Sequence, residues 1–304
     1  MDENTNPELP RGVRLEDVHG TPAVLVEIAA CTAVIHLDGG HLTSWVPAGQ
    51  DDVLWTSPDA VYAEGESIRG GIPLIGPWFG PGRDGLSVPA HGWLRRERWE
   101  LVSAERFHGW ADGDADVADS DAVAITLGLR DADADPSGQG ITAQVHFAIA
   151  ADHLQVRLDV TAGTAPLELE AALHTYLSVG DVRSCSLSGF AGARYLDNLQ
   201  DLAAFTQDGE PHLTGPIDRV YDVSGPVTVH DEVLERDILI TPRSATRTVL
   251  WNPWSDGAAH LQDMPLESWQ QFLCVETAVA KDGAVNLAAG ETHTLQARYE
   301  VIGR

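Results

Sequence analysis

The 304-residue sequence is poor in basic side chains and has a single lysine, and each scarcity excludes a class of function. Lysine and arginine together number 19 against 46 aspartates and glutamates, which gives a net charge of −27. Nucleic acids and anionic membrane surfaces would repel such a chain, so neither is expected as its partner. The single lysine, Lys281, leaves one candidate for Schiff-base chemistry, and we expect no cofactor anchored in that way.

Cysteines and long apolar runs are also scarce. Cys31, Cys185 and Cys274 are odd in number and widely spaced, so the sequence predicts no disulfide framework and favours a reducing compartment. No run approaches the roughly 18 apolar residues of a membrane-spanning helix. The first residues have neither the basic region nor the apolar segment of a signal peptide. We therefore expect a cytoplasmic protein.

The apolar residues that are present occur in short runs separated by glycine, proline and polar turns, a pattern typical of β-strands. From Leu154 to Val160, for example, every second residue is apolar, which predicts one buried face. No window of a dozen residues sustains a helical period, so helices should be few and short. The pattern predicts an all-β protein built as a large antiparallel β-sandwich or barrel. Strands are expected at 23–30, 33–37, 42–46, 53–56, 123–129, 143–149, 154–160, 167–179, 227–229, 237–241, 247–251, 272–277 and 292–302.

No linker and no internal repeat divides the chain. Residues 1–12 are polar and contain two prolines, so we expect a flexible tail there and a single domain over residues 13–304. The acidic segments 112–121 and 131–135 lack the sharp-turn glycine and final glutamate of a calcium loop, and we expect solvated loops. The sequence has no His-Glu-x-x-His pattern and no quartet of cysteine and histidine, so we expect no metal ion.

The segment from Ile68 to Trp99 concentrates unusual residues. Its glycines, prolines and three tryptophans indicate a rigid, shaped loop on which a sugar ring could stack. Gly80 to Gly85 matches the dinucleotide-binding glycine pattern, but prolines flank it where a helix should begin, so we expect a turn and no nucleotide. Five arginines lie within 30 positions, where an even spread would put roughly two. In an acidic protein this cluster favours binding of a small anion, with an internal ion-pair network as the alternative. The arginines are Arg69, Arg83, Arg95, Arg96 and Arg98.

Two titratable residues lie in segments that otherwise have the pattern of buried strands. The apolar side chains of 167–179 would pack on one face, which leaves His174 on the other; a structural role or exposure to solvent would explain it as well. Glu276 would share a face with the apolar side chains of its strand, where a carboxylate needs a partner or its pKa rises. An ion pair in the core would explain Glu276 equally well. Together, a carboxylate and a histidine can act as base and acid in the opening of a cyclic sugar hemiacetal.

Seven short motifs follow one another over most of the chain. They are Arg69-Gly-Gly-Ile-Pro, Pro77-Trp-Phe-Gly80, Pro89-Ala-His-Gly92 with Arg95, Leu173-His-Thr-Tyr176, Tyr195-Leu-Asp197, Val249-Leu-Trp-Asn-Pro-Trp254 and Cys274-Val-Glu-Thr-Ala278. In this order the motifs resemble the hexose-6-phosphate branch of the aldose 1-epimerases, or mutarotases. The resemblance implies a galactose-mutarotase-like β-sandwich and an isomerase that interconverts the α and β anomers of a hexose 6-phosphate, with glucose 6-phosphate expected, without metal, nucleotide or other cofactor.

The same resemblance implies roles for particular residues. Glu276 would be the catalytic base on the C1 hydroxyl, and His174 the catalytic acid at the ring oxygen. The residues implied in substrate binding are His91 and Asp197 for the sugar hydroxyls and Arg69 and Arg95 for the phosphorylated part.

One departure from the family pattern and two alternatives accompany this interpretation. Some relatives carry glutamine where this chain has Ala90, so a substrate contact made there is absent or comes from elsewhere. The chemistry could act on a free aldose, or the chain could bind sugar phosphates without catalysis, since a fold does not prove activity. We expect a monomer whose partner is a small hexose phosphate.

Overall fold

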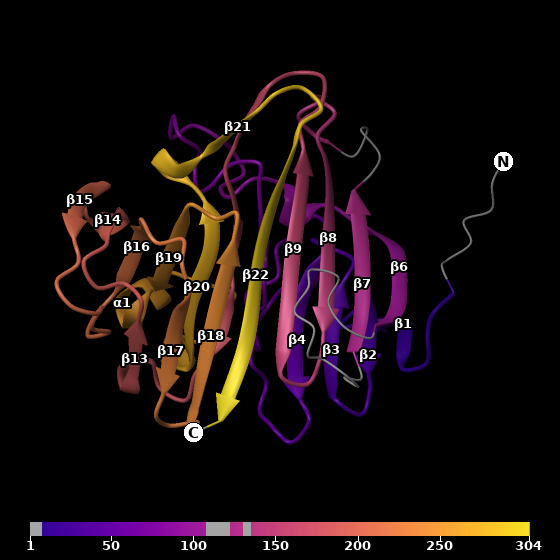
Figure 1. Cartoon of the computed structure of the whole chain (residues 1–304), viewed down its shortest axis with the longest axis horizontal. Coiled ribbons are helices and arrows are strands. Elements are labelled where there is room, and N and C mark those ends of the chain that lie inside the picture. The colour runs from indigo at the N-terminus through magenta and orange to yellow at the C-terminus, as the bar shows by residue number, and fades with distance from the viewer. Residues whose placement is uncertain (1–7, 108–121, 130–134, 304) are drawn as a thin grey trace.

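The computed structural model describes residues 8–107, 122–129 and 135–303, and it is an antiparallel β-sandwich. One eight-stranded sheet forms one layer, and the other layer is formed by a four-stranded and a second eight-stranded sheet (Figure 1). The prediction of an all-β sandwich with few short helices is confirmed. Residues 1–7 of the expected tail, the acidic segment 112–121 and residues 131–134 lie outside the described residues.

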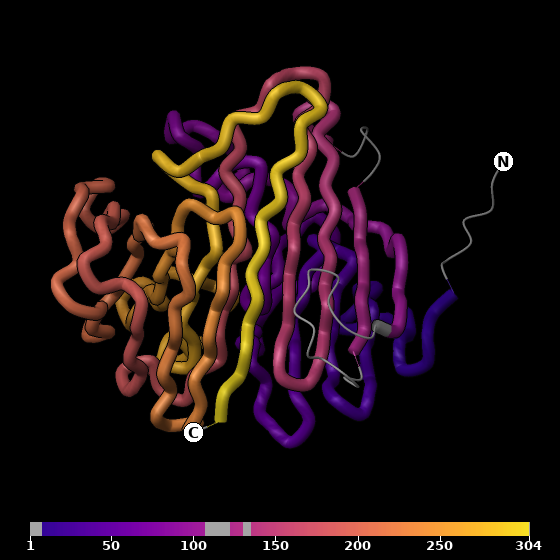
Figure 2. The backbone as a smooth tube through the Cα atoms, viewed as in Figure 1, coloured from indigo at the N-terminus to yellow at the C-terminus, as the bar shows by residue number. Residues whose placement is uncertain are grey.

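The first layer has the strand order β13-β17-β18-β22-β9-β8-β7-β6. The last strand, β22, crosses the middle of this layer between β9 and β18, where Figure 2 shows it in yellow. In β9 the side chains at every second position from Leu154 to Val160 are buried, as their alternation predicts. The strands are β6 (Glu100–Phe107), β7 (Ala122–Leu129), β8 (Thr142–Ile149), β9 (His153–Thr161), β13 (Cys185–Ser188), β17 (Val227–Asp231), β18 (Arg236–Arg243) and β22 (Thr292–Gly303).

The second layer combines two sheets of different size. The four-stranded sheet consists of β1 (Val13–Val18), β2 (Thr21–Glu27), β3 (Cys31–His36) and β4 (His41–Pro47). The eight-stranded sheet has the order β15-β14-β16-β19-β20-β11-β5, with β12 also paired to β20. Its strands are β5 (Leu74–Ile75), β11 (Ala171–Leu173), β12 (Tyr176–Ser178), β14 (Arg194–Asp197), β15 (Ala203–Thr206), β16 (Ile217–Tyr221), β19 (Arg247–Asn252) and β20 (Phe272–Val279).

Short elements complete the described chain. Strands β10 (Leu167–Leu169) and β21 (Val285–Leu287) form a separate pair. No helix in the described ranges is long and apolar enough to cross a membrane. The helical turns are α1 (Trp254–Ala258) and the 3₁₀ turns η1 (Leu94–Arg96), η3 (Val182–Ser184), η4 (Asn198–Gln200), η5 (Leu266–Gln271) and η6 (Lys281–Gly283).

The core lies between the two layers, and polar side chains in it are hydrogen-bonded across the gap. The indole of Trp45 donates to the carbonyl of Ala150 at 3.0 Å, and the hydroxyls of Thr175 and Tyr299 are 2.6 Å apart. All eight residues of β20 are buried. This strand is therefore held rigidly in the middle of its sheet, and it carries Glu276.

The prediction of one continuous strand over 167–179 is wrong. The segment forms β10, β11 and β12, because Glu170 and the pair His174 and Thr175 leave the strand geometry. The carboxylate of Glu170 accepts hydrogen bonds from the backbone N–H groups of Phe79 and Lys281. The backbone N–H of His174 donates to the Pro73 carbonyl at 3.1 Å. The expected strand at 53–56 is likewise reduced to isolated bridges. These breaks turn His174 inward, where it is 7% exposed.

Backbone segments approach closely where the loop carrying His91 meets the end of β5. Gly92 has a φ of 70° and forms a parallel bridge with Gly76. A Cβ atom added at Gly92 would lie 1.9 Å from the carbonyl oxygen of Gly76, so no larger residue fits without moving the backbone. The neighbouring Trp93 N–H bonds to that same oxygen at 2.9 Å. This contact fixes the loop against the sheet.

We expect Gly92→Ala to destabilise the protein much more than Gly85→Ala. Both glycines have φ near 70°, but a Cβ atom at Gly85 meets nothing within 4 Å. The left-handed backbone costs both variants about 1–2 kcal/mol, and the collision should cost Gly92→Ala roughly 1–3 kcal/mol more. Urea unfolding measures the difference, and equal free energies of unfolding for the two variants would contradict the close contact.

Candidate active site

A cavity of about 420 Å³ lies over the second eight-stranded sheet and contains most of the residues singled out from the sequence. Strand register brings its floor together: Tyr176 pairs with Cys274, Cys274 with Trp251, and Trp251 with Asp218. Directly paired residues point to the same side of a sheet, so this row spans four strands on one face. Cavities of this size hold small metabolites. The predicted site residues that line it are Arg69, His91, Arg95, His174 and Glu276.

The structure brings His174 and Glu276 together although they are far apart in the sequence. The Nε2 atom of His174 lies 3.4 Å from Oε1 of Glu276, and the two side chains are 9% and 1% exposed. The His174 ring stacks on Tyr176 with centroids 4.9 Å apart and meets Trp251 edge-on. Nδ1 of His174 and Oε2 of Glu276 are buried, and neither has a hydrogen-bond partner among the described residues. Buried polar atoms usually have a partner, so these two are candidates for interaction with a ligand.

Burial shifts the pKa values of Glu276 and His174 in opposite directions. It raises the pKa of Glu276 well above the ordinary range, helped by the nearby charge of Asp218 and opposed by Arg95. Burial also lowers the pKa of His174, together with His91, Arg95 and Arg69. In water the histidine holds a proton about two pH units more tightly than the carboxylate. Here both shifts run against that order, and they favour the state in which Glu276 is protonated and His174 is neutral.

His91 approaches the pair from the loop that begins after β5. Its backbone N–H donates to the Gly80 carbonyl at 2.7 Å, and its ring Nδ1 accepts the Gly80 N–H at 3.3 Å. Burial lowers the pKa of His91 to about 3, reinforced by the charges of Arg95, Lys281 and Arg69. The ring is therefore neutral at pH 7. Because Nδ1 is an acceptor, Nε2 carries the hydrogen and can donate to a ligand hydroxyl.

The two predicted arginines are held in different ways. Arg69 forms an ion pair with Asp263 at 3.1 Å and donates to the hydroxyl of Tyr176 at 3.0 Å. Arg95 donates to the Ala90 carbonyl at 3.0 Å, its Nε is buried without a partner, and burial lowers its pKa to about 10. No carboxylate in the described residues pairs with Arg95. Arg95 is thus a cation suited to an anionic ligand.

The structure does not bring Asp197 to the cavity. Its buried carboxylate pairs with Arg219 at 3.2 Å and caps η4 by accepting the Leu199 N–H at 3.0 Å. Asp218 lines the cavity instead, with Asn198 donating to it at 2.5 Å. The sequence does not identify Asp218, because the charged residues of β16 interrupt the apolar alternation by which a strand is recognised. Trp251 lies in an expected strand, but its pairing with Asp218 follows only from the fold.

The remaining features of the segment 68–99 serve the surrounding structure. Trp93 and Trp99 are buried in the core, and the indole of Trp78 donates to the Pro89 carbonyl at 2.8 Å. The tryptophan on the cavity floor is Trp251, which lies outside this segment. The other three arginines also lie outside the cavity lining. Arg83 pairs with Glu168, Arg96 with Glu66 and Arg98 with Asp38.

Within the described ranges, no group of three or more histidine, cysteine, aspartate or glutamate side chains is arranged to hold a metal ion. The residues that line the cavity offer acid, base and hydrogen-bond donor groups. Such an arrangement is suited to moving protons on a hydroxylated ligand.

Comparison with known proteins places the chain among relatives of similar length. Residues 22–300 match the family model of the aldose 1-epimerases. An Escherichia coli protein provisionally named glucose-6-phosphate 1-epimerase is 33% identical over 266 residues, which cover 85% of this chain and 83% of that protein. A Cenchrus ciliaris protein with the same provisional name is 28% identical over 274 residues, covering 86% and 78%.

Solved structures show the same architecture. A provisionally named mutarotase from Salmonella typhimurium superposes with a TM-score of 0.84 at 25% identity, covering 98% of this chain and 96% of its own. A galactose mutarotase-like protein from Clostridium acetobutylicum shares the fold, with a TM-score of 0.70 at 11% identity and coverage of 96% and 98%.

We expect Asp218→Asn to lower the pKa of Glu276. The Asp218 carboxylate favours the protonated form of its neighbour, so its removal should let Glu276 lose the proton at lower pH. Carbon-13 NMR of the Glu276 carboxyl group measures the titration midpoint. Asp201→Asn is the control, because it makes the same chemical change at an exposed turn residue. A midpoint that stays at the wild-type value in Asp218→Asn would refute the coupling.

Proposed function

Because this chain belongs to the aldose 1-epimerase family, we propose that it interconverts the α and β anomers of a hexose 6-phosphate, with glucose 6-phosphate the expected substrate. The resemblance seen in the sequence is confirmed by the match over residues 22–300. The observation that carries the proposal is the buried pair of His174 and Glu276, 3.4 Å apart, which lines the cavity and in which each side chain has one polar atom without a hydrogen-bond partner in the described residues. Relatives provisionally named glucose-6-phosphate 1-epimerase support the substrate class.

Ring opening uses the pair in one protonation state. The carboxylate of Glu276 takes the proton of the C1 hydroxyl, and the electrons of that O–H bond form the C1 carbonyl. The bond between C1 and the ring oxygen breaks, and the ring oxygen takes a proton from the His174 imidazolium. The products are the open aldehyde, a protonated Glu276 and a neutral His174.

Ring closure uses the same pair in the reverse sense. After rotation about the C1–C2 bond, the C5 hydroxyl attacks the other face of the aldehyde and returns its proton to His174. Glu276 gives its proton to the C1 oxygen, which completes the opposite anomer. The pair holds one proton throughout, and the shifted pKa values favour the state from which ring closure starts, with Glu276 protonated and His174 neutral.

Recognition of the substrate would come from the surrounding side chains. The neutral His91 donates to a hydroxyl, Asp218 and Asn198 accept from or donate to others, and the ring of Trp251 covers an apolar face of the sugar. Arg95, which has no carboxylate partner in the described residues, would bind the phosphate together with Arg69.

A free aldose is the second candidate substrate. The observation that favours it is the ion pair between Arg69 and Asp263, because an arginine already neutralised in this way contributes less to binding a phosphate. The two candidates share the same proton transfers and differ in the charge of the ligand.

The proposal also includes the setting of the enzyme. We propose that residues 13–304 act as one unit, as a monomer in the cytoplasm, on a small hexose phosphate. The acidic composition and the odd cysteine count support it.

We expect Glu276→Gln and His174→Asn each to slow enzymatic anomer exchange by roughly 10²- to 10⁴-fold, the range of a lost general acid or base. Exchange spectroscopy of glucose 6-phosphate by NMR measures the rate above the spontaneous one. Glu235→Gln, on the exposed turn before β18, should keep wild-type exchange. Undiminished exchange in both site variants would exclude the pair. Binding of glucose 6-phosphate without any acceleration by the wild type would instead identify a non-catalytic binding protein.

We expect Arg69→Ala to raise KM for glucose 6-phosphate by roughly tenfold or more while changing KM for glucose little, since a charged hydrogen bond contributes about 1.5–3 kcal/mol. The same NMR assay with both sugars measures this. Asp263→Asn is the matched control, because it breaks the ion pair but keeps the Arg69 charge in place. Equal losses for the two sugars in Arg69→Ala would favour the free aldose.

A further inference from the structure

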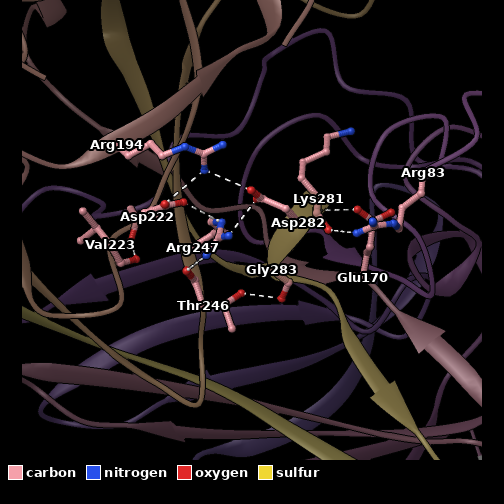
Figure 3. A network of polar contacts seen from close by, with 11 residues as sticks. Arg83, Glu170, Arg194, Asp222, Val223, Thr246, Arg247, Lys281, Asp282 and Gly283 are labelled. Atoms are coloured by element: carbon pink, nitrogen blue, oxygen red, sulfur yellow. Dashed lines mark hydrogen bonds and ion pairs between the residues drawn. The ribbon is translucent and has the colours of Figure 1, made fainter. Parts of the chain in front are cut away.

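Lys281, the single lysine of the chain, lines the same cavity as the catalytic pair. Its Nζ atom lies 5.5 Å from the centroid of the Phe79 ring. No hydrogen-bond acceptor or carboxylate in the described part of the chain bonds to Nζ. Figure 3 shows its ammonium group pointing away from the polar network below it. The cavity wall therefore carries an ammonium group that forms no ion pair within the described residues, although its charge acts on the nearby Asp218.

The backbone of Lys281 is held by a carboxylate that takes no part in the proton transfers. Oε1 of Glu170 accepts the Lys281 N–H at 2.6 Å, and Oε2 of Glu170 accepts the Phe79 N–H at 3.1 Å. Glu170 is 2% exposed. This one buried side chain ties together the two segments that carry the ammonium and the ring beneath it. Because both of its oxygens accept backbone N–H groups, it leaves the Lys281 ammonium unpaired.

The turn that follows Lys281 is fixed from its other side. Arg83 donates a hydrogen bond to the Lys281 carbonyl (Figure 3). The carboxylate of Asp282 forms ion pairs with Arg247 at 2.8 Å and with Arg194 at 3.0 Å. Lys281 itself has a φ of 57°, a conformation that non-glycine residues rarely adopt. The backbone of Lys281 is thus fixed by contacts on both sides of the turn.

The charge of Lys281 acts on His91, as do the charges of Arg95 and Arg69. Arg95, Lys281 and Arg69 all add to the burial that lowers the pKa of His91. Of these three cations, Arg69 is paired with Asp263, whereas Arg95 and Lys281 have no carboxylate partner in the described residues. A phosphate group carries up to two negative charges and accepts several hydrogen bonds, which matches a site with unpaired cations.

We propose that Lys281 is a specificity-determining residue that binds the phosphate of the sugar phosphate. This inference rests on the proposed substrate class. Unlike a planar guanidinium, an ammonium on a flexible stem binds phosphate as a point charge, so Lys281 can follow the phosphate as the sugar ring opens and closes.

The test compares Lys281→Met with the wild type, because methionine keeps the length and the apolar stem over Phe79 but removes the charge. Calorimetry measures binding of glucose 6-phosphate, glucose and inorganic phosphate to the full chain, and the NMR assay gives KM and kcat. We expect Lys281→Met to weaken binding of glucose 6-phosphate and to raise its KM by roughly tenfold or more. Binding of inorganic phosphate should weaken likewise, whereas glucose binding and kcat should be unchanged.

Two further variants separate a specific charge from a structural effect. Lys281→Arg should recover most of the binding of glucose 6-phosphate, because it restores the positive charge. Arg14→Met removes one exposed charge on β1, in the other sheet of the layer, and should leave binding of both sugars unchanged.

Equal weakening for glucose and glucose 6-phosphate in Lys281→Met, or no weakening for either, would overturn the proposal. A wild-type chain that binds glucose 6-phosphate but does not accelerate anomer exchange would refute the proposed activity alone. The calorimetric comparison would then still decide the role of Lys281.

Discussion

Burial of a carboxylate beside an imidazole is the constraint on which the rest of this site depends. Glu276 lies on a strand with no exposed residue, and its only charged or titratable neighbour within ion-pair distance in the described residues is His174. A carboxylate in such surroundings favours its protonated form, and an imidazole favours its neutral form. Both shifts favour the state in which Glu276 holds the proton and His174 is neutral. This is the protonation state from which the proposed ring closure starts.

The surrounding architecture keeps this pair in place. Strand register places Asp218 and Trp251 on the face of the sheet that also carries Cys274 and Glu276. The break after β11 turns the His174 side chain toward Glu276. The close contact of Gly76 and Gly92 presses the His91 loop against the sheet. Glu170 joins the same loop to the turn carrying Lys281. Each part of the cavity wall is therefore anchored to the sheet by backbone hydrogen bonds, which costs little reorganisation when a ligand binds.

Some site residues could be identified from the sequence, and others could not. His174 and Glu276 were recognisable because a polar group in an apolar strand pattern needs an explanation. Asp218 was not, since its strand is short and carries other charged residues. Asp197 belongs to a matching motif, yet its carboxylate is occupied by Arg219 and the cap of η4. Motif matching names residue types, but it does not say which way a side chain points.

Periodicity, composition and motif order were enough to determine the all-β class and the family and to single out His174 and Glu276, because these depend on local patterns of residues. The tertiary structure alone decided which side chains share the cavity. Arg69 and Asp263, or Lys281 and Glu170, are more than 100 positions apart and meet only when the sheets have paired. The distances between such groups, and with them their charges and partners, follow from strand register and loop closure, which no local pattern encodes.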